Sequence, residues 1–180
     1  MDLRVQKTKN NIINAFIKLR TRKPIDKITI KELSEAAMIN KATFYLHYKD
    51  IYDLSDSIED ELIRNCLQSI PNPDTLFSKQ GFEELTQIMQ SQGELFNIIF
   101  SDSRTDVLIT KLDAGLKQLF FQTHPEFIDN IKTNVTLTAL IHGCFYTYFQ
   151  YKDDPNSAAV IEGLSQICES CYPFRFEATR

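Results

Sequence analysis

Long segments with helical spacing of apolar residues, separated by short breaks, limit what this chain can fold into. The breaks are Pro24, Pro71-Asn72-Pro73, Ser101-Asp102-Ser103, His124-Pro125 and Asp153-Asp154-Pro155. Between them, apolar residues recur every three or four positions, which is the period of an amphipathic helix. The alternation of apolar and polar residues that indicates strands is absent from the sequence. The pattern therefore predicts an all-α protein.

The first two expected helices carry clear signals. Residues 5–20 place Ile12, Phe16 and Leu19 on one apolar stripe. A second, short helix is expected to begin at Thr29-Ile30-Lys31-Glu32 and to end near residue 37. This segment is a capping box, in which the Thr29 hydroxyl accepts from the Glu32 amide and the Glu32 carboxylate reaches back to Thr29.

A third short helix and a longer fourth helix follow. Asn40 is the expected N-cap of a helix over 41–48, with Phe44 and Tyr48 facing inward. Asp50 is the expected N-cap of a helix that continues to about residue 70. Two short helices joined by about three residues after a longer helix are typical of a helix-turn-helix, whose second helix enters the DNA major groove by its N-terminal residues.

The charge of the chain is unevenly distributed. Residues 1–50 contain 11 Lys and Arg against 5 Asp and Glu, a net charge of +6. Residues 51–180 contain 9 against 19, a net charge of −10. A basic first quarter on an acidic body suits a polyanionic partner at one end of the protein, although a solvated basic helix face would give the same count.

Two segments resemble a known family. Residues 28–37 (ITIKELSEAA) and 40–54 (NKATFYLHYKDIYDL) are similar to the DNA-binding domain of TetR/AcrR-type transcriptional regulators, in which the recognition helix reads roughly S-K-G-T-L-Y-Y-H-F-K. The resemblance covers about residues 5–66. It implies a helix-turn-helix DNA-binding domain over 1–50, a fourth helix that connects to about residue 70, and a helical effector-binding and dimerisation domain over 51–180.

The resemblance also implies which residues contact DNA. Thr29 is expected at a phosphate, the start of the third helix is expected to meet DNA, and Lys49 is expected to support a backbone contact. The positions implied are Thr29, Asn40, Lys41, Ala42, Thr43, Tyr45, Leu46, His47 and Lys49.

The chain departs from the family pattern at a few positions. Met38 stands where the family usually has glycine, so we expect the turn to adopt a conformation that a side chain tolerates. Leu46 replaces a common aromatic residue and lacks its hydroxyl or stacking face, and Ile51 replaces a common lysine. These departures predict fewer phosphate contacts than are usual for the family.

The segment 127–151 is apolar on two sides. One expected face carries Ile128, Ile131, Val135, Ala139, His142, Phe145 or Tyr146, and Phe149; the other carries Leu137, Leu140, Ile141, Cys144, Tyr148 and Tyr151. Both faces then need covering. The resemblance implies that this helix and the one over 158–168 form a four-helix interface in a homodimer. The alternative is a monomer whose other helices cover both faces.

The resemblance further implies an effector pocket within the C-terminal helices. The candidate lining residues are Phe96, Phe100, Phe120, His142, Tyr146 and Phe149. Each of them also fits a plain core position. His142 is expected to be a buried titratable group or a core histidine bonded to Thr138.

The function predicted is that of a homodimeric DNA-binding regulator, a repressor released from a palindromic operator when a small-molecule effector binds. The alternative is a co-activator with the same DNA-binding domain, controlled by a protein partner. An enzyme is disfavoured, because the sequence contains no nucleophile elbow, H-E-x-x-H motif or glycine-rich nucleotide loop.

No cofactor or metal is expected, and Cys168-Glu169-Ser170-Cys171 is interpreted as a pair of idle thiols, since no strand precedes it and no second ligand pair completes a zinc site. The first ten residues, MDLRVQKTKN, lack the apolar core of a signal peptide. No apolar run approaches the length that crosses a bilayer. We therefore expect a cytoplasmic protein with no membrane partner.

Overall fold

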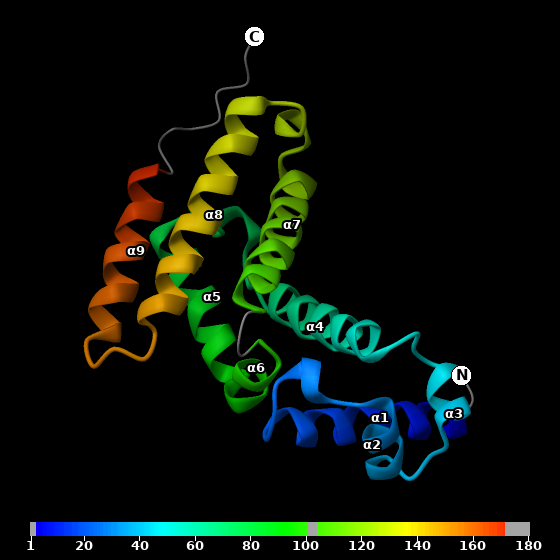
Figure 1. Cartoon of the computed structure of the whole chain (residues 1–180). Helices are drawn as coiled ribbons and strands as arrows, with labels where there is room; N and C mark the ends of the chain where they lie inside the picture. Colours follow the sequence, from blue (N-terminus) through cyan, green and yellow to red (C-terminus); the bar gives the residue numbers. More distant parts are fainter. Residues whose placement is uncertain (1–2, 101–103, 172–180) are drawn as a thin grey trace. The chain divides into compact units, whose positions relative to one another are not determined.

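A computed structural model describes residues 3–100 and 104–171, and these residues form helices and turns without any strand (Figure 1). The predicted all-α class is confirmed over this part of the chain. The Ser101-Asp102-Ser103 break lies outside the described residues. The elements are α1 (Leu3–Arg20), η1 (Ile25–Lys27), α2 (Ile30–Ala36), α3 (Lys41–Tyr45), α4 (Ile51–Gln68), η2 (Pro73–Thr75), α5 (Lys79–Ser91), α6 (Gly93–Ile99), α7 (Thr105–Thr123), η4 (Pro125–Phe127), α8 (Ile131–Tyr151) and α9 (Ser157–Cys171).

The helices form two compact units. The first unit contains α1, η1, α2, α3, the part of α4 that ends at Leu62, and α6 from Glu94. The second unit contains α4 from Ile63, followed by η2, α5, α7, η4, α8 and α9. Across residues 3–100 and 104–171, each helix is too short or too polar to traverse a lipid bilayer.

The core of the first unit is built from the stripes that the sequence predicts. α1 packs against α2, and α2 packs against α3. Phe16 of α1, Leu33 of α2, Phe44 of α3 and Leu54 of α4 are completely buried. Each such apolar side chain contributes about 1.5–3 kcal/mol relative to full exposure.

Side-chain caps fix where α2 and α4 begin. Thr29 Oγ1 accepts from the Glu32 amide at 3.2 Å, which confirms half of the predicted capping box. The other half is wrong, because the Glu32 carboxylate accepts from Lys23 Nζ at 2.6 Å. Asp50 Oδ1 accepts from the amides of Tyr52 and Asp53 at 2.8 and 2.9 Å, so the predicted cap of α4 is confirmed.

The turn after α2 contains a left-handed residue. Met38 has φ +55° and is the one non-glycine residue with positive φ in the part of the chain that the structure describes. The Ile39 amide donates to Ser34 O at 2.9 Å and the Met38 amide donates to Glu35 O at 3.2 Å, which is the Schellman pattern of a helix end. The expectation of a conformation suited to a side chain is therefore wrong, because these two bonds require a left-handed residue at this position.

Two arginines, Arg20 and Arg104, bind acceptors in the first unit. Arg20 donates to Lys23 O at 3.2 Å and to Ile98 O of α6 at 3.1 Å. Arg104 lies 2.6 Å from the carboxylate of Glu59, which is completely buried on α4. Removing one partner of a buried ion pair destabilises a protein by about 3–5 kcal/mol. The Arg104–Glu59 pair therefore holds α4 in the unit, and the bond from Arg20 to Ile98 O holds α6.

The second unit is a layer of helices in which α5 and α8 both pack against α9, and α7 packs against α8. Aromatic pairs fill its interior, with ring centroids 5.7 Å apart for Phe77 and Phe120 and 5.5 Å apart for Phe82 and Phe145. α8 begins at Ile131, later than predicted, because Asn130 Oδ1 caps it by accepting from the amides of the second and third helical residues.

Replacing Met38 with glycine is expected to stabilise the protein. The side chain is 92% exposed, so little packing is lost, and glycine adopts positive φ without the steric cost that Cβ imposes. The left-handed conformation costs about 1–2 kcal/mol for other residues, and the added freedom of glycine in the unfolded chain removes about 0.4–1 kcal/mol of the gain. We expect M38G to raise the free energy of unfolding by about 0.5–1 kcal/mol in urea titrations.

The matched control is M38A, which shortens the side chain and keeps the Cβ. Its stability should stay close to that of the wild type. An equal gain in both variants would show that the methionine side chain, and not the backbone conformation, is the source of the effect.

Candidate nucleic-acid interface

α3 begins with a side-chain cap that also orients its first turn. Asn40 Oδ1 accepts from the Thr43 amide at 2.7 Å and from the Thr43 hydroxyl at 2.9 Å. The prediction that Asn40 caps this helix is confirmed. The Asn40 carbonyl oxygen is occupied in this way, so the N–H groups of its amide are the donors left for a partner outside the chain.

The two sides of α3 differ sharply in exposure. Phe44 is completely buried and Tyr48, just after the helix, is 8% exposed, with ring centroids 5.9 Å apart. Both are the inward-facing anchors that the sequence predicts. Burial is the main cause that raises the pKa of the Tyr48 phenol. The remaining residues of the segment are displayed on the protein surface.

The residues implied to contact DNA fall on this displayed side or close to it. Thr43 and His47 are half-buried. The others are exposed: Thr29, Asn40, Lys41, Ala42, Tyr45, Leu46 and Lys49. The structure therefore brings together, around α3, every residue of the set except Thr29, which caps the neighbouring α2.

The helix ends earlier than predicted, at Tyr45 and not at Tyr48. The amides of His47 and Tyr48 both donate to Phe44 O, which closes the last turn. The Lys49 amide then donates to Asp53 Oδ2 at 2.8 Å, so the segment after α3 is held to the first turn of α4. The sequence analysis did not predict this bond, which joins residues four positions apart.

The charges around α3 are available to an external partner. Among the described residues, neither Lys41 nor Lys49 forms an ion pair, whereas Lys23 and Lys27 pair with Glu32 and Asp26. Two exposed ammonium groups thus flank the displayed side of α3. Ammonium groups of this kind supply the salt-dependent part of binding to a phosphate backbone.

The six effector-pocket candidates are divided between the two units. Phe96 and Phe100 pack on each other in the first unit, with ring centroids 4.9 Å apart. In the second unit, Phe120 lies in an aromatic cluster with Phe77, and Phe149 lies beside Tyr148. Helical periodicity identifies apolar positions without showing which of them share a cavity, so the effector pocket stays a prediction.

His142 is not the buried group that was expected. Its side chain is 48% exposed, and its Nε2 lies 3.9 Å from Asp113 Oδ1 on α7. Thr138, the expected hydrogen-bond partner, accepts from Lys117 and donates to the Asn134 carbonyl. The apolar residues around His142 in the sequence face inward on either side of it, while His142 itself faces out.

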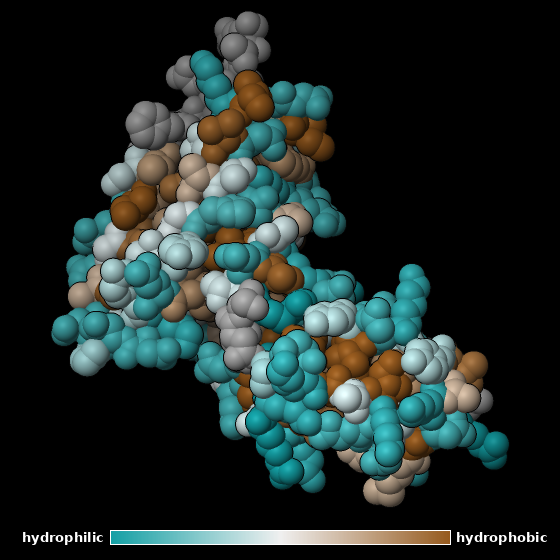
Figure 2. Space-filling model, viewed as in Figure 1, coloured by the Kyte–Doolittle hydropathy of each residue, from teal (hydrophilic) through white to brown (hydrophobic). Residues whose placement is uncertain are grey.

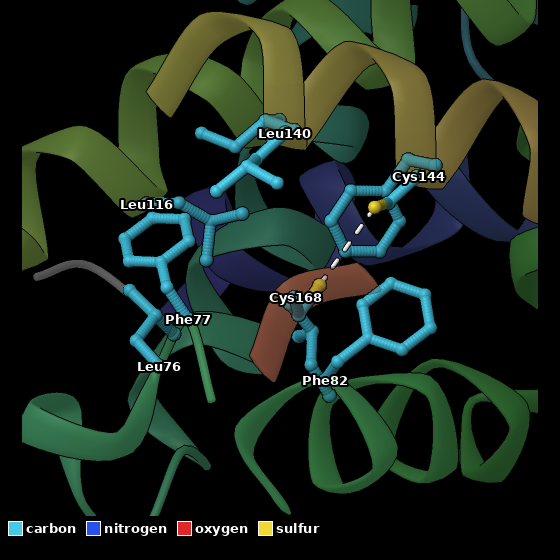
Figure 3. A pocket seen from close by; sticks show the side chains of 10 residues that line it. Leu76, Phe77, Phe82, Leu116, Leu140, Cys144 and Cys168 are labelled. Carbon is cyan, nitrogen blue, oxygen red and sulfur yellow. Dashed lines mark hydrogen bonds between the residues drawn. The ribbon is translucent and has the colours of Figure 1, made fainter. Parts of the chain in front are cut away.

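The interior of the second unit encloses a small cavity of about 10 Å³ (Figure 3). Apolar residues and two thiols surround it, including Phe77, Phe82, Leu116, Cys144 and Cys168. None of the six candidates lines it. Pockets that bind drug-sized ligands have volumes of roughly 300–1,000 Å³, so this cavity has room for about one water molecule and no effector.

An open groove of about 380 Å³ lies between α7 and α8. His142 and Tyr146, two of the candidates, line it together with Asp106, Ile109 and Thr110. The sequence analysis did not identify the three α7 residues. Their i, i+3, i+4 spacing on one helix face was the available signal, but a face that carries two polar residues and one apolar residue is common on the surface of a helix.

All four cysteines are free thiols, and Cys168 forms no disulfide with Cys171, the other cysteine of its C-x-x-C motif. Its sulfur lies 3.7 Å from Cys144 Sγ, which brings α8 and α9 together beside the cavity (Figure 3). Contact with Cys144 and burial raise the pKa of the Cys168 thiol. Burial also raises the pKa of the Cys66 thiol, to about 11.

These environments predict an order of thiol reactivity. At pH 8, Cys66 stays protonated because its pKa of about 11 lies far above the pH, and the protonated thiol is a poor nucleophile. Cys171 is half-buried, whereas the other three cysteines are buried. We therefore expect iodoacetamide to alkylate Cys171 first, and peptide mass spectrometry locates the modified residue. All four should react in guanidinium chloride. Alkylation of Cys66 as fast as Cys171 in the folded protein would contradict this assignment.

Compared with known proteins, the chain matches no family model and no curated sequence.

Proposed function

We propose that this chain is a transcriptional regulator of the TetR/AcrR type, a DNA-binding protein and not an enzyme. Residues 1–50 form its helix-turn-helix domain, and α3 is the recognition helix. The observation that carries the proposal is the displayed side of α3, where Lys41, Tyr45 and Leu46 are exposed opposite the buried Phe44. The net charge of +6 over residues 1–50 also supports binding to a DNA duplex, whose phosphates are negatively charged.

The exposed residues divide by the chemistry that each can offer. Lys41 and Lys49 provide ammonium groups for phosphates, and Thr29 provides a hydroxyl at the start of α2. Asn40 and Tyr45 provide donors that reach phosphates or base edges. The set proposed to contact DNA remains Thr29, Asn40, Lys41, Ala42, Thr43, Tyr45, Leu46, His47 and Lys49.

The test begins with selection of binding sites from a random duplex library by the wild-type protein. We expect a selected site to bind with salt-dependent affinity, and the double variant K41A/Y45A to bind roughly tenfold more weakly at 0.15 M salt. K41A alone should reduce the slope of log affinity against log salt by about 1 for each bound copy of the chain, and so by about 2 for a dimer. Fluorescence anisotropy of labelled duplexes measures both effects.

K79A is the matched control, because it removes an exposed lysine from α5 in the second unit. Its affinity and salt slope should equal those of the wild type. Failure of the wild type to select any sequence, or equal weakening by K79A and K41A, would count against the proposed interface.

We extend the proposal to a homodimer formed through α8 and α9. Ile131, Val135 and Tyr146 on α8 and Ile167 on α9 are exposed large apolar side chains. Figure 2 shows pale and brown side chains along these two helices among hydrophilic ones. The opposite side of α8 is buried, with Leu137 completely so. A second copy would cover the exposed side, since apolar surface of this extent marks interfaces.

Two charges on this face should prevent dimerisation. We expect the wild type to sediment as a dimer at micromolar concentration and I131E/V135E to sediment as a monomer, because association would bury the introduced carboxylates. Q118E, at an exposed position of α7, is the control and should remain dimeric. A monomeric wild type, or a dimeric double variant, would contradict the assignment.

The dimer would present two recognition helices to half-sites about one helical turn apart on a palindromic operator. In the leading form of the proposal, the protein is a repressor that a small-molecule effector releases from DNA by binding the non-DNA conformation better. The alternative is a co-activator controlled by a protein partner. The cavity of about 10 Å³ is too small for an effector, whereas the groove of about 380 Å³ between α7 and α8 has room for a small ligand and is open to a protein segment.

A further inference from the structure

Exposed apolar side chains gather around α3. Single exposed apolar residues are common on protein surfaces, but here Met38, Tyr45, Leu46 and Tyr52 lie within 15 positions of one another. Leu46 is 82% exposed. It follows Ala42, also exposed, by four positions, so the two side chains lie on one side of the helix with Tyr45 beside them.

The backbone holds Leu46 in this exposed position. Leu46 is the C-cap of α3, and its amide donates to Ala42 O at 3.2 Å. Phe44, on the opposite side, is completely buried and occupies the space toward the core. The Leu46 side chain therefore cannot turn inward without breaking the last turn of the helix.

The charges on either side indicate what covers this apolar spot. Lys41 and Lys49 flank it in the sequence, and both are exposed with no ion pair among the described residues. An apolar protein partner would bury these ammonium groups without compensation. A DNA major groove offers phosphates to both lysines, and its base edges carry one apolar group, the C5 methyl of thymine.

We propose that Leu46, together with Ala42, contacts the methyl group of a thymine in each operator half-site and so selects thymine at that position. This inference rests on the proposed function. Leucine has no hydroxyl with which to bond a phosphate, so its contribution to binding is apolar and comes from the methyl contact. Leu46 is thus a specificity-determining residue, while Lys41 and Lys49 supply affinity that does not depend on sequence.

Deoxyuridine provides the test, because it removes the methyl group and leaves the base pairing unchanged. Starting from the site selected by the wild type, each thymine is replaced singly and the dissociation constant is measured at fixed salt. We expect one replacement per half-site to weaken wild-type binding about fourfold, the factor that corresponds to about 0.8 kcal/mol for one buried methyl group. L46A should lose most of the difference between the thymine and uracil duplexes, because only Ala42 is then left to contact the methyl group.

M38A is the matched control, because it removes another exposed apolar side chain near α3 and should keep the full deoxyuridine effect. Circular dichroism melting of each variant shows that it is folded. Failure of the wild type to select a sequence overturns the proposed function and this inference with it. A selected site at which no deoxyuridine weakens binding, or at which L46A retains the effect, overturns the inference alone and leaves the DNA-binding function standing.

Discussion

The turn from Ala37 to Asn40 determines which residues of α3 reach the surface. A left-handed Met38 closes α2 through two backbone hydrogen bonds, and Asn40 opens α3 two residues later. With both ends fixed, the helix has one orientation in which Phe44 fills the core while α3 packs against α2. An insertion or deletion of one residue in this turn would rotate α3 by about 100°, which would move Phe44 away from the core.

Local signals predicted the N-terminal unit well. The caps at Thr29, Asn40 and Asp50 depend on side chains that bond amides two or three residues away, so the sequence contains all the information they need. The buried stripe of α1 follows from helical spacing in the same way. The conformation of Met38 could not be predicted, because residue preference alone disfavours the left-handed region and the hydrogen bonds of the helix end override it.

The C-terminal unit was harder to predict, since its features depend on which helices meet. The helical spacing of apolar residues correctly divided much of α8 into a buried and an exposed side. The same spacing did not show that the His142 side chain faces outward toward Asp113. The six aromatic and histidine candidates were chosen one by one, and packing separates them into different clusters. The 3.7 Å approach of Cys144 and Cys168 joins residues of two helices, which no local pattern reveals.

The bond from Arg20 to Ile98 O links positions 78 residues apart in the chain. Arg20 is buried, with 5% of its surface exposed. Its acceptor belongs to α6, and α6 is synthesised only after the segment 63–93, which belongs to the other unit. During synthesis, the first helices emerge from the ribosome well before α6 does, and until then one acceptor of a buried guanidinium is missing. Completion of the N-terminal unit therefore waits for translation past residue 98, and a fragment that stops at the end of α4 would fold without this link.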